Sequence, residues 1–243
     1  FEELDYLNEA DNIRRTATLH ADVSRIIVPD VVQEATTRRV LTMEFLDGIP
    51  PDEAVSVCYP RDLRDQWGVT LFEFTLRGLF EHRFLHADPN FANFAFREDG
   101  KVAVYDYGCM KEIPADLAAG YAGLIDAVLF NRKGALPEKL RHRGVFKEGG
   151  APLPRDMIDP YVDLMQDIVR ASPPYTFGDD DSIYETLYEL GMSNWQNAND
   201  IRFPSDVVFI DRTLAGLFGN LGKLGATGPW RELLRKYTAP PLD

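Results

Sequence analysis

The sequence predicts an α+β fold in which a small mixed segment precedes a mostly helical body. Residues 25–48 are rich in β-branched and apolar residues, which favours strands, whereas apolar residues from position 61 onward recur at the spacing of amphipathic helices. Gly and Pro punctuate residues 47–51, which indicates a linker where the character of the chain changes. Residues 1–16 show helical spacing with acids in the first turns, so a helix is expected ahead of the strands.

The strand-rich segment is expected to form a pair of strands, at residues 25–35 and 38–48, with Pro29 marking a break or an edge in the first. Between residues 94 and 106, two short apolar runs flank Asp99-Gly100, a dipeptide typical of tight hairpin turns. The sequence therefore predicts a β-hairpin inside the helical body.

Helices are expected at residues 61–82, 115–132, 155–171, 182–190 and 206–223. Ser182 and Glu185 have the spacing of a capping box at the start of the fourth of these. Ser205 is a candidate cap for the last helix, and Gly225 is a candidate terminator.

Composition is that of an ordinary globular protein, with 243 residues, of which 45% are hydrophobic and 27% charged. The 39 acidic residues outnumber the 26 basic ones, and the net charge of -13 argues against a nucleic-acid partner. Cys58 and Cys109 are too few for a disulfide framework, so a cytoplasmic location is expected. The chain opens at Phe1 inside a helical pattern, which predicts a piece of a longer protein.

The segment from residue 81 to 108 carries the clearest chemical signal. A helix leads into a loop with His86, Asp88 and Asn93, and the predicted hairpin then leads to Asp106. Phosphoryl transfer needs one carboxylate near the acceptor hydroxyl, and a second carboxylate with an amide to hold Mg²⁺ against the nucleotide phosphates. The H-A-D-P-N-F-A-N and D-Y-G segments have the spacing of the protein-kinase motifs H-R-D-x-x-x-x-N and D-F-G.

A second interpretation takes these Asp and Asn residues as turn formers. That interpretation explains each residue singly but not the spacing of all four. For His86 the structural role is preferred, because a histidine here can orient the loop without acting as a base.

The opening helix carries Glu3, Asp5 and Glu9, which suit a helix amino terminus on electrostatic grounds alone. Under the kinase interpretation, one of these acids would instead pair with the lysine that binds the α- and β-phosphates. Met43, Glu44 and Phe45 would then lie at the hinge after the two strands, where backbone groups could bond adenine.

The chain resembles the UbiB/AarF family of atypical kinase-like proteins, which is associated with ubiquinone biosynthesis. The matching segments are E-L-D-Y-L-N-E-A (3–10), V-P-D-V (28–31), V-L-T-M-E-F-L-D-G (40–48), L-H-A-D-P-N-F-A-N (85–93), V-Y-D-Y-G (104–108) and the helix at 209–226. The resemblance implies a protein-kinase-like fold, with a partial N-lobe at residues 1–46 and a helical C-lobe at residues 47–243.

The resemblance also implies site roles. Asp88 matches the catalytic-loop aspartate, and Asn93 and Asp106 match the metal ligands. On the nucleotide side, Glu3 and Asp5 match the family's E-x-D element and Glu9 matches the glutamate of the C-helix.

ATP and Mg²⁺ are the implied cofactors of an atypical kinase or ATPase that supports ubiquinone or related lipid metabolism. Only about seven residues separate Gly108 from the next predicted helix, so no peptide platform follows D-Y-G, and Ala87 replaces the arginine of protein kinases. Both features favour water or a small-molecule, lipid or quinone-pathway acceptor. Peripheral contact with the inner membrane is left open.

The family's K-x-G-Q segment, alanine-rich nucleotide loop and β3 lysine have no counterpart in these 243 residues, so this chain alone is expected to be inactive. Two alternatives remain. One is a nucleotide-binding pseudokinase that regulates partners in a lipid pathway. The other is a small-molecule phosphotransferase of the aminoglycoside or choline type, against which the E-x-D element argues.

Overall fold

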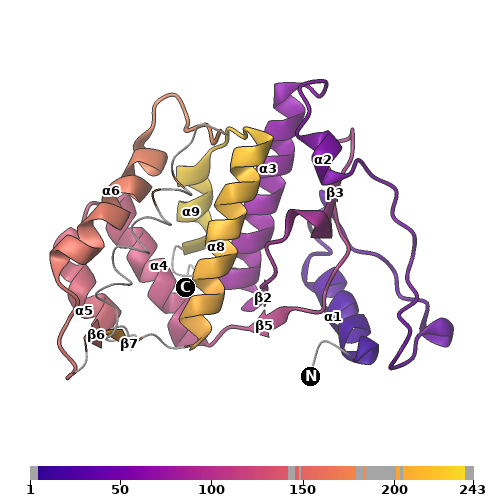
Figure 1. Ribbon diagram of the computed structural model, residues 1–243, viewed down its shortest axis with the longest axis horizontal. Helices are drawn as coiled ribbons and strands as arrows, with labels where there is room; N and C mark the ends of the chain where they lie inside the picture. The colour runs from indigo at the N-terminus through magenta and orange to yellow at the C-terminus, as the bar shows by residue number, and fades with distance from the viewer. Residues whose placement is uncertain are drawn as a thin grey trace.

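A computed structural model describes residues 5–141, 146–147, 149–178, 183, 186, 201–202 and 205–238. Most of the helices form one body, and α1 lies beside it, past the short strands at residues 84–86 and 110–112 (Figure 1). The helices are α1 (Tyr6–Leu19), α2 (Pro51–Ala54), α3 (Arg61–Leu76), α4 (Ala115–Leu129), α5 (Leu136–Arg141), α6 (Arg155–Arg170), α8 (Ser205–Leu224) and α9 (Trp230–Thr238). Within the described residues, no helix is both long enough and apolar enough to cross a bilayer.

The strands are short and, in the part of the chain that the structure describes, form three small sheets. They are β1 (Ile26–Ile27), β2 (Phe84–His86), β3 (Phe94–Phe96), β4 (Val102–Val104), β5 (Met110–Glu112), β6 (Phe146–Lys147) and β7 (Ile201–Arg202). β3 and β4 form the predicted hairpin, with Phe94 opposite Val104, and β1 adds to β4 in parallel. Gly100 adopts a positive φ of 81° in the hairpin turn, which glycine accommodates without strain. β5 was not predicted, and it pairs antiparallel with β2.

The predicted pair of long strands at residues 25–35 and 38–48 is wrong in extent. Only Ile26–Ile27 forms a strand, and its partner is β4 rather than the second segment. The two segments do run antiparallel, but among the described residues the only β-bridge between them joins Val31 and Met43, and side-chain hydrogen bonds such as that from the Thr42 hydroxyl to the Ala35 carbonyl add to their contact. The apolar side chains of residues 25–48 therefore pack against the hairpin more than they support strand pairing between the two segments.

Helix boundaries differ from the predicted ones by a few residues, for local reasons. α1 begins at Tyr6 because the Asp5 side chain caps it, accepting a hydrogen bond from the Leu7 N–H. The predicted helix at 61–82 is α-helical only to Leu76, and residues Arg77–Glu81 form a π-helical turn.

The carboxy-terminal predictions are resolved in part. Ser205 is the first residue of α8 rather than a residue ahead of it, and Gly225 ends α8 with a φ of 61°. The predicted capping pair Ser182 and Glu185 lies outside the described residues.

The core centres on α3. The Trp67 side chain is fully buried, its Nε1 donates to the Arg97 carbonyl at 2.8 Å, and its ring packs 5.1 Å from that of Phe96. On the next residue, Gly68, a Cβ would lie 2.3 Å from the Ala226 Cβ. The absence of a side chain at Gly68 therefore lets α3 approach the segment that follows α8, and this fixes α8 against α3.

We predict that Gly68→Ala lowers the free energy of unfolding by about 1–3 kcal/mol, because the added methyl group overpacks this contact. The matched control is Gly219→Ala on α8, where a Cβ would meet nothing within 4 Å. There, higher helix propensity should stabilise by about 0.5–1 kcal/mol. Urea unfolding of both variants measures the difference, and equal effects of the two substitutions would contradict the packing argument.

A buried charge network ties the end of α1 to α3. Arg77 is 5% exposed, and its Nη2 donates to the Leu19 carbonyl and, at 2.7 Å, to the Asp22 carboxylate. His20 packs beside the rings of Phe74 and His82. Burial, followed by the nearby His82 and Arg77, lowers the pKa of His20 to about 3. His20 is therefore neutral in the folded protein at neutral pH.

We predict that the free energy of unfolding falls as pH drops from 7 to 5.5. The His20 pKa is about 3 when folded but near its ordinary 6.5 when unfolded, so below pH 6.5 the unfolded chain binds the extra proton. The slope from this one group reaches at most about 1.4 kcal/mol per pH unit. His20→Phe keeps the aromatic packing and should flatten the slope in urea titrations at both pH values. An unchanged slope in that variant would contradict the assignment.

Candidate phosphoryl-transfer site

The pairing of β2 with β5 brings two chain segments together. His86 on β2 lies opposite Met110 on β5, and just beyond the strands the Ala87 N–H donates to the Cys109 carbonyl at 2.8 Å. As a result, the loop that begins at Asp88 lies beside the D-Y-G segment that precedes β5. The unpredicted strand β5 is therefore what closes the site.

The His86 ring links the two segments directly. Its Nε2 lies 2.6 Å from the Asp106 carbonyl oxygen. A carbonyl oxygen can only accept, so Nε2 carries the hydrogen. Burial lowers the pKa of His86, which favours the neutral ring. His86 is buried and bonded to the backbone, which agrees with the structural role predicted for it.

Asp88 and Asn93 contact each other across the loop. The Asn93 Nδ2 donates to the Asp88 Oδ2 at 2.8 Å, and the Asn90 N–H donates to the other oxygen of Asp88 at 3.3 Å. The Tyr105 N–H donates to the Asn93 carbonyl, which brings the residue before Asp106 to the same place. The five-residue spacing noted in the sequence thus corresponds to a direct side-chain contact.

Oxygen donors remain open for a hard cation. Because Asn93 uses its nitrogen toward Asp88, its Oδ1 is left to face elsewhere. Asp106 is exposed, and the only hydrogen bond to its side chain in the described part of the chain is from the Gly108 N–H to Oδ1, at 2.8 Å. Among described residues, no cluster of three His, Cys, Asp or Glu side chains has metal-binding geometry. A pair of oxygen donors fits Mg²⁺, which keeps several waters and takes further oxygens from phosphates.

α1 holds the D-Y-G segment from the other side. The Asn12 Nδ2 donates to the Tyr107 carbonyl at 2.9 Å, and the Tyr107 N–H donates to the Glu9 Oε1 at 3.2 Å. Burial raises the pKa of Glu9, and the nearby Asp106 raises it further although the Tyr107 N–H opposes both. No ion pair within the described residues involves Glu9, and its contact with a nucleotide-binding lysine stays a prediction.

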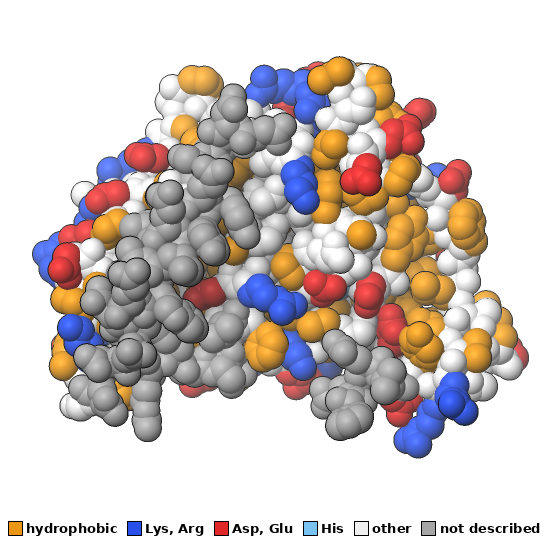
Figure 2. Space-filling model, in the orientation of Figure 1, with side chains coloured by type: hydrophobic (Ala, Val, Ile, Leu, Met, Phe, Trp, Pro, Cys, Tyr) orange, Lys and Arg blue, Asp and Glu red, His pale blue; other side chains and the backbone are white. Residues whose placement is uncertain are grey.

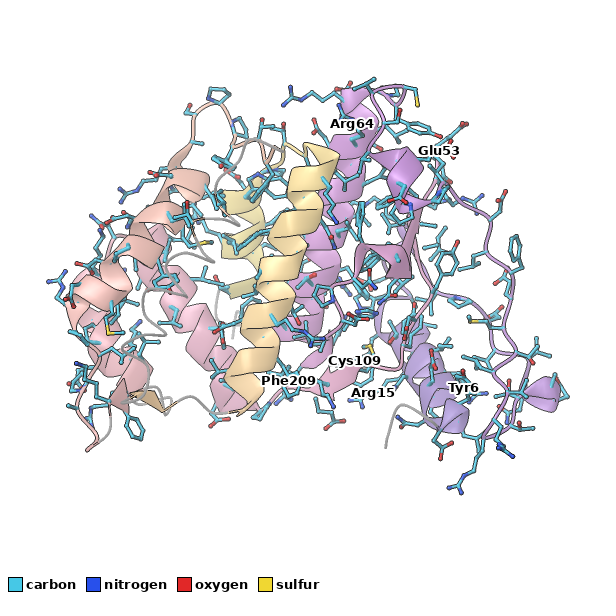
Figure 3. All side chains as sticks on the ribbon, viewed as in Figure 1. Tyr6, Arg15, Glu53, Arg64, Cys109 and Phe209 are labelled. Carbon is cyan, nitrogen blue, oxygen red and sulfur yellow. The ribbon has the colours of Figure 1, made fainter. Side chains whose placement is uncertain are left out.

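Arg15 anchors the same helix to the β2–β5 sheet (Figure 3). Its guanidinium lies 4.0 Å from the centroid of the Phe84 ring and pairs with Glu112 at 2.6 Å. On the face shown in Figure 2, acidic side chains lie in the region where α1 approaches this sheet, with basic side chains beside them.

The remaining predicted nucleotide residues lie apart from this cluster. Asp5 caps α1 and pairs with Arg38 at 3.3 Å, while Glu3 lies outside the described residues. Met43 takes part in the bridge to Val31.

The other two predicted hinge residues are open to solvent. The Glu44 N–H already donates to the Asp30 carbonyl at 2.7 Å, so it is not available to adenine in this arrangement. Phe45 is 88% exposed. The hinge role of these residues stays a prediction.

One face of α8 supports the loop, and sequence reasoning missed its role. A Cβ on Gly216 would lie 2.2 Å from the Pro89 Cβ, and the Asn220 Nδ2 donates to the Pro89 carbonyl at 2.9 Å. One turn further, the Lys223 Nζ lies 5.4 Å from the centroid of the Phe91 ring. The signal available in the sequence was Asn220 itself, the one polar side chain in the apolar run of residues 214–222, which requires a partner where it is buried.

Comparisons with known proteins agree with this geometry. The model of the ABC1 atypical kinase-like domain matches residues 1–138, more than half of the chain. Protein ACTIVITY OF BC1 COMPLEX KINASE 3, chloroplastic, of Arabidopsis thaliana is 35% identical over 123 residues, covering 48% of this chain and 16% of its own length. Atypical kinase COQ8B, mitochondrial, of Danio rerio is 32% identical over 126 residues, covering 51% of this chain and 20% of its own length. Atypical kinase coq-8, mitochondrial, of Caenorhabditis elegans is 25% identical over 97% of this chain and 32% of its own length.

A solved structure extends the similarity to the whole fold. The Mycobacterium tuberculosis protein Rv3197, in its complex with erythromycin, superposes with a TM-score of 0.76 at 23% identity, over 97% of this chain and 58% of its own. The predicted kinase-like α+β fold and the predicted resemblance to the UbiB/AarF family are both confirmed. The chain spans about a third or less of the length of these curated relatives. The division into lobes at residues 46 and 47 stays a prediction.

We predict that Asn220→Ala loosens the Asp88 loop, because the Pro89 carbonyl loses its donor. The free energy of unfolding should fall by about 1 kcal/mol. Amide hydrogen exchange at Asn90, Ala92 and Asn93 should accelerate by more than the fall in the free energy of unfolding explains. Gly219→Ala, one residue away on the same helix, should not accelerate the exchange of these amides. Equal exchange in both variants would contradict a support role for Asn220.

Proposed function

This chain belongs to the ABC1 atypical kinase-like family, and from that premise we propose that it forms the catalytic half of an Mg-ATP-dependent kinase or ATPase. The resemblance to the UbiB/AarF family implies a role in ubiquinone or related lipid metabolism, and we extend this role to the present protein; relatives such as COQ8B and coq-8 are named atypical kinases. Asp88 is assigned the positioning of the attacking oxygen. Asn93 and Asp106 are assigned to Mg²⁺.

The observation that carries this proposal is the orientation of the Asn93 amide. Its nitrogen donates to the Asp88 carboxylate, so its carbonyl oxygen is the atom left to serve as a metal ligand. Asp106 is tied to the loop through the His86 ring, and its carboxylate stays exposed. When bound, Mg²⁺ would offset the phosphate charge that otherwise repels the attacking oxygen. Asp88 would orient that oxygen and accept its proton, a role that suits a carboxylate whose backbone is restricted by the following Pro89.

The space after the D-Y-G segment supports a small acceptor. β5 begins at Met110 and α4 at Ala115, so the chain leaves the site at once and builds no peptide platform there. Ala87 is fully buried, where an arginine could receive an activation-loop phosphate in protein kinases. We therefore propose water or a small-molecule or lipid hydroxyl as the acceptor.

One observation favours a second candidate, a nucleotide-binding pseudokinase. Glu9 contacts the Tyr107 backbone, and the sequence contains no V-A-I-K-like segment to supply its lysine partner. Turnover distinguishes the two candidates, because a pseudokinase would bind nucleotide without hydrolysing it.

We predict that Asp106→Asn weakens Mg²⁺-dependent ATP binding by about tenfold or more, because a neutral amide replaces the anionic ligand of a hard cation. The measurement is a titration of a fluorescent ATP analogue with and without Mg²⁺, in a form of the protein extended to include a nucleotide loop. The control is Asp99→Asn in the hairpin turn, where the exposed carboxylate pairs with Lys101. Wild-type Mg²⁺ dependence in the Asp106 variant would rule out the metal assignment.

We predict that the extended protein releases phosphate from ATP and that Asp88→Asn slows this by about a hundredfold or more. The 243-residue chain alone should remain at the level of a blank, since its sequence has no alanine-rich loop or β3 lysine. Strong ATP turnover by the 243-residue chain, abolished by Asp88→Asn, would contradict its expected inactivity. Efficient Asp88-dependent labelling of proteins from γ-labelled ATP would contradict the small acceptor.

A further inference from the structure

The helical body contains a large apolar cavity away from the Asp88 loop. Its volume is about 780 Å³, and side chains from α3, α4, α6, α8 and α9 line it. Figure 1 shows these helices arranged around a common interior. The volume falls within the range of about 300–1,000 Å³ typical of small-molecule sites.

The wall of the cavity is almost wholly hydrocarbon. Leu, Ile, Val, Met and aromatic side chains make up most of it, including Leu124, Met165, Phe218 and Trp230. Water is poorly accommodated by such a wall because it finds few hydrogen-bond partners there. An apolar space of this size left without an apolar occupant would also forfeit the contacts that its lining side chains could make. The chemistry of the wall therefore calls for an apolar ligand.

The Tyr121–Asp211 pair interrupts this wall, and Arg212, the residue after Asp211, also lines the cavity. The Tyr121 hydroxyl donates to the Asp211 Oδ1 at 2.7 Å, and both residues line the cavity. Asp211 has an exposed side chain, yet burial raises the pKa of its carboxyl even though the Tyr121 hydrogen bond lowers it. A carboxyl group that is accessible and yet surrounded by protein atoms is expected where the side chain faces a cavity rather than the outer surface. The second oxygen of Asp211 can accept a further hydrogen bond.

The cavity is distinct from the phosphoryl-transfer site. Asp88, Asn93 and Asp106 are absent from its lining, and Gly216 and Asn220 contact Pro89 from the same helix whose Ala215 and Phe218 face the cavity. α8 is thus a wall shared by two sites.

We propose that this cavity is a second binding site, which takes an uncharged amphiphile with an apolar chain or ring system along the hydrocarbon wall and one hydroxyl group at Asp211 and Tyr121. An anionic head is disfavoured at the Tyr121–Asp211 pair, because it would be placed against the Asp211 carboxylate in an apolar surrounding. Arg212 is the cation of the lining that could hold an anion instead, so stronger displacement of a probe by an anionic than by an uncharged amphiphile would overturn the proposal. This site does not depend on the proposed phosphoryl transfer, and its test uses no nucleotide.

The test uses the 243-residue chain and the uncharged fluorescent probe N-phenyl-1-naphthylamine, whose emission rises in apolar surroundings. We expect saturable binding, and displacement by 1-decanol at concentrations about tenfold lower than by decanoate, which has the same chain length and an anionic head. Asp211→Leu should remove this preference for the alcohol. Equal displacement by the two competitors in the wild-type chain would overturn the proposal.

Location is tested by filling the cavity. Ala215→Phe should weaken probe binding about tenfold, whereas Ala119→Phe, on an exposed position of α4 outside the lining, should leave it within about twofold. Equal effects of these variants would overturn the proposal.

Should Ala215→Phe fail to fold, photo-crosslinking of the wild-type chain with a diazirine-bearing decanol decides. Labelling of lining residues on α4, α6 or α8 supports the cavity site. Labelling confined to other residues, or no saturable binding of the probe, shows that no ligand occupies the cavity and overturns it.

Discussion

The hydrogen bond from the buried His86 ring to the Asp106 carbonyl is the constraint on which the site depends. It joins two segments that lie twenty residues apart in the chain, and it does so through the backbone of Asp106 rather than its carboxylate. The carboxylate is therefore left exposed while its position is fixed from behind. Asp88, two residues after His86, is placed by the same contact. This bond requires a hydrogen on Nε2, because a carbonyl oxygen can only accept. A neutral imidazole with its hydrogen there makes the bond without placing a charge in the buried interior.

α1 imposes the second constraint on the same segment. Asn12 and Glu9 bind the carbonyl and the N–H of Tyr107, so the backbone of this one residue is held on both sides by one helix. At the far end of α1, Arg77 binds the Leu19 carbonyl from within the helical body. Arg15 adds a contact to β5 through Glu112. A displacement of α1 would therefore be transmitted directly to the D-Y-G segment and to the carboxylate that precedes it.

The two sides of α8 contact different parts of the fold. Its contacts with Pro89 depend on the small size of Gly216 and on one amide, Asn220, while its other side contributes to the apolar cavity. α8 is rigid along its length, because backbone hydrogen bonds join each turn of a helix to the next. These contacts with the Asp88 loop come from α8, which lies outside residues 1–138, the part that matches the family model.

The sequence by itself determined the fold class, the hairpin, most of the helices and the loop from Asp88 to Asn93, because these rest on local spacing, turn chemistry and amphipathic period. It also indicated the family. The tertiary structure alone decided which strands pair: β1 joins β4, and β2 joins β5, since two- and three-residue strands carry too little pattern to specify a partner. It likewise decided that Glu9 meets the Tyr107 backbone and that Asn220 meets Pro89, a contact across 131 residues. Such contacts depend on how packed helices orient distant side chains, and no local pattern in the chain encodes that orientation.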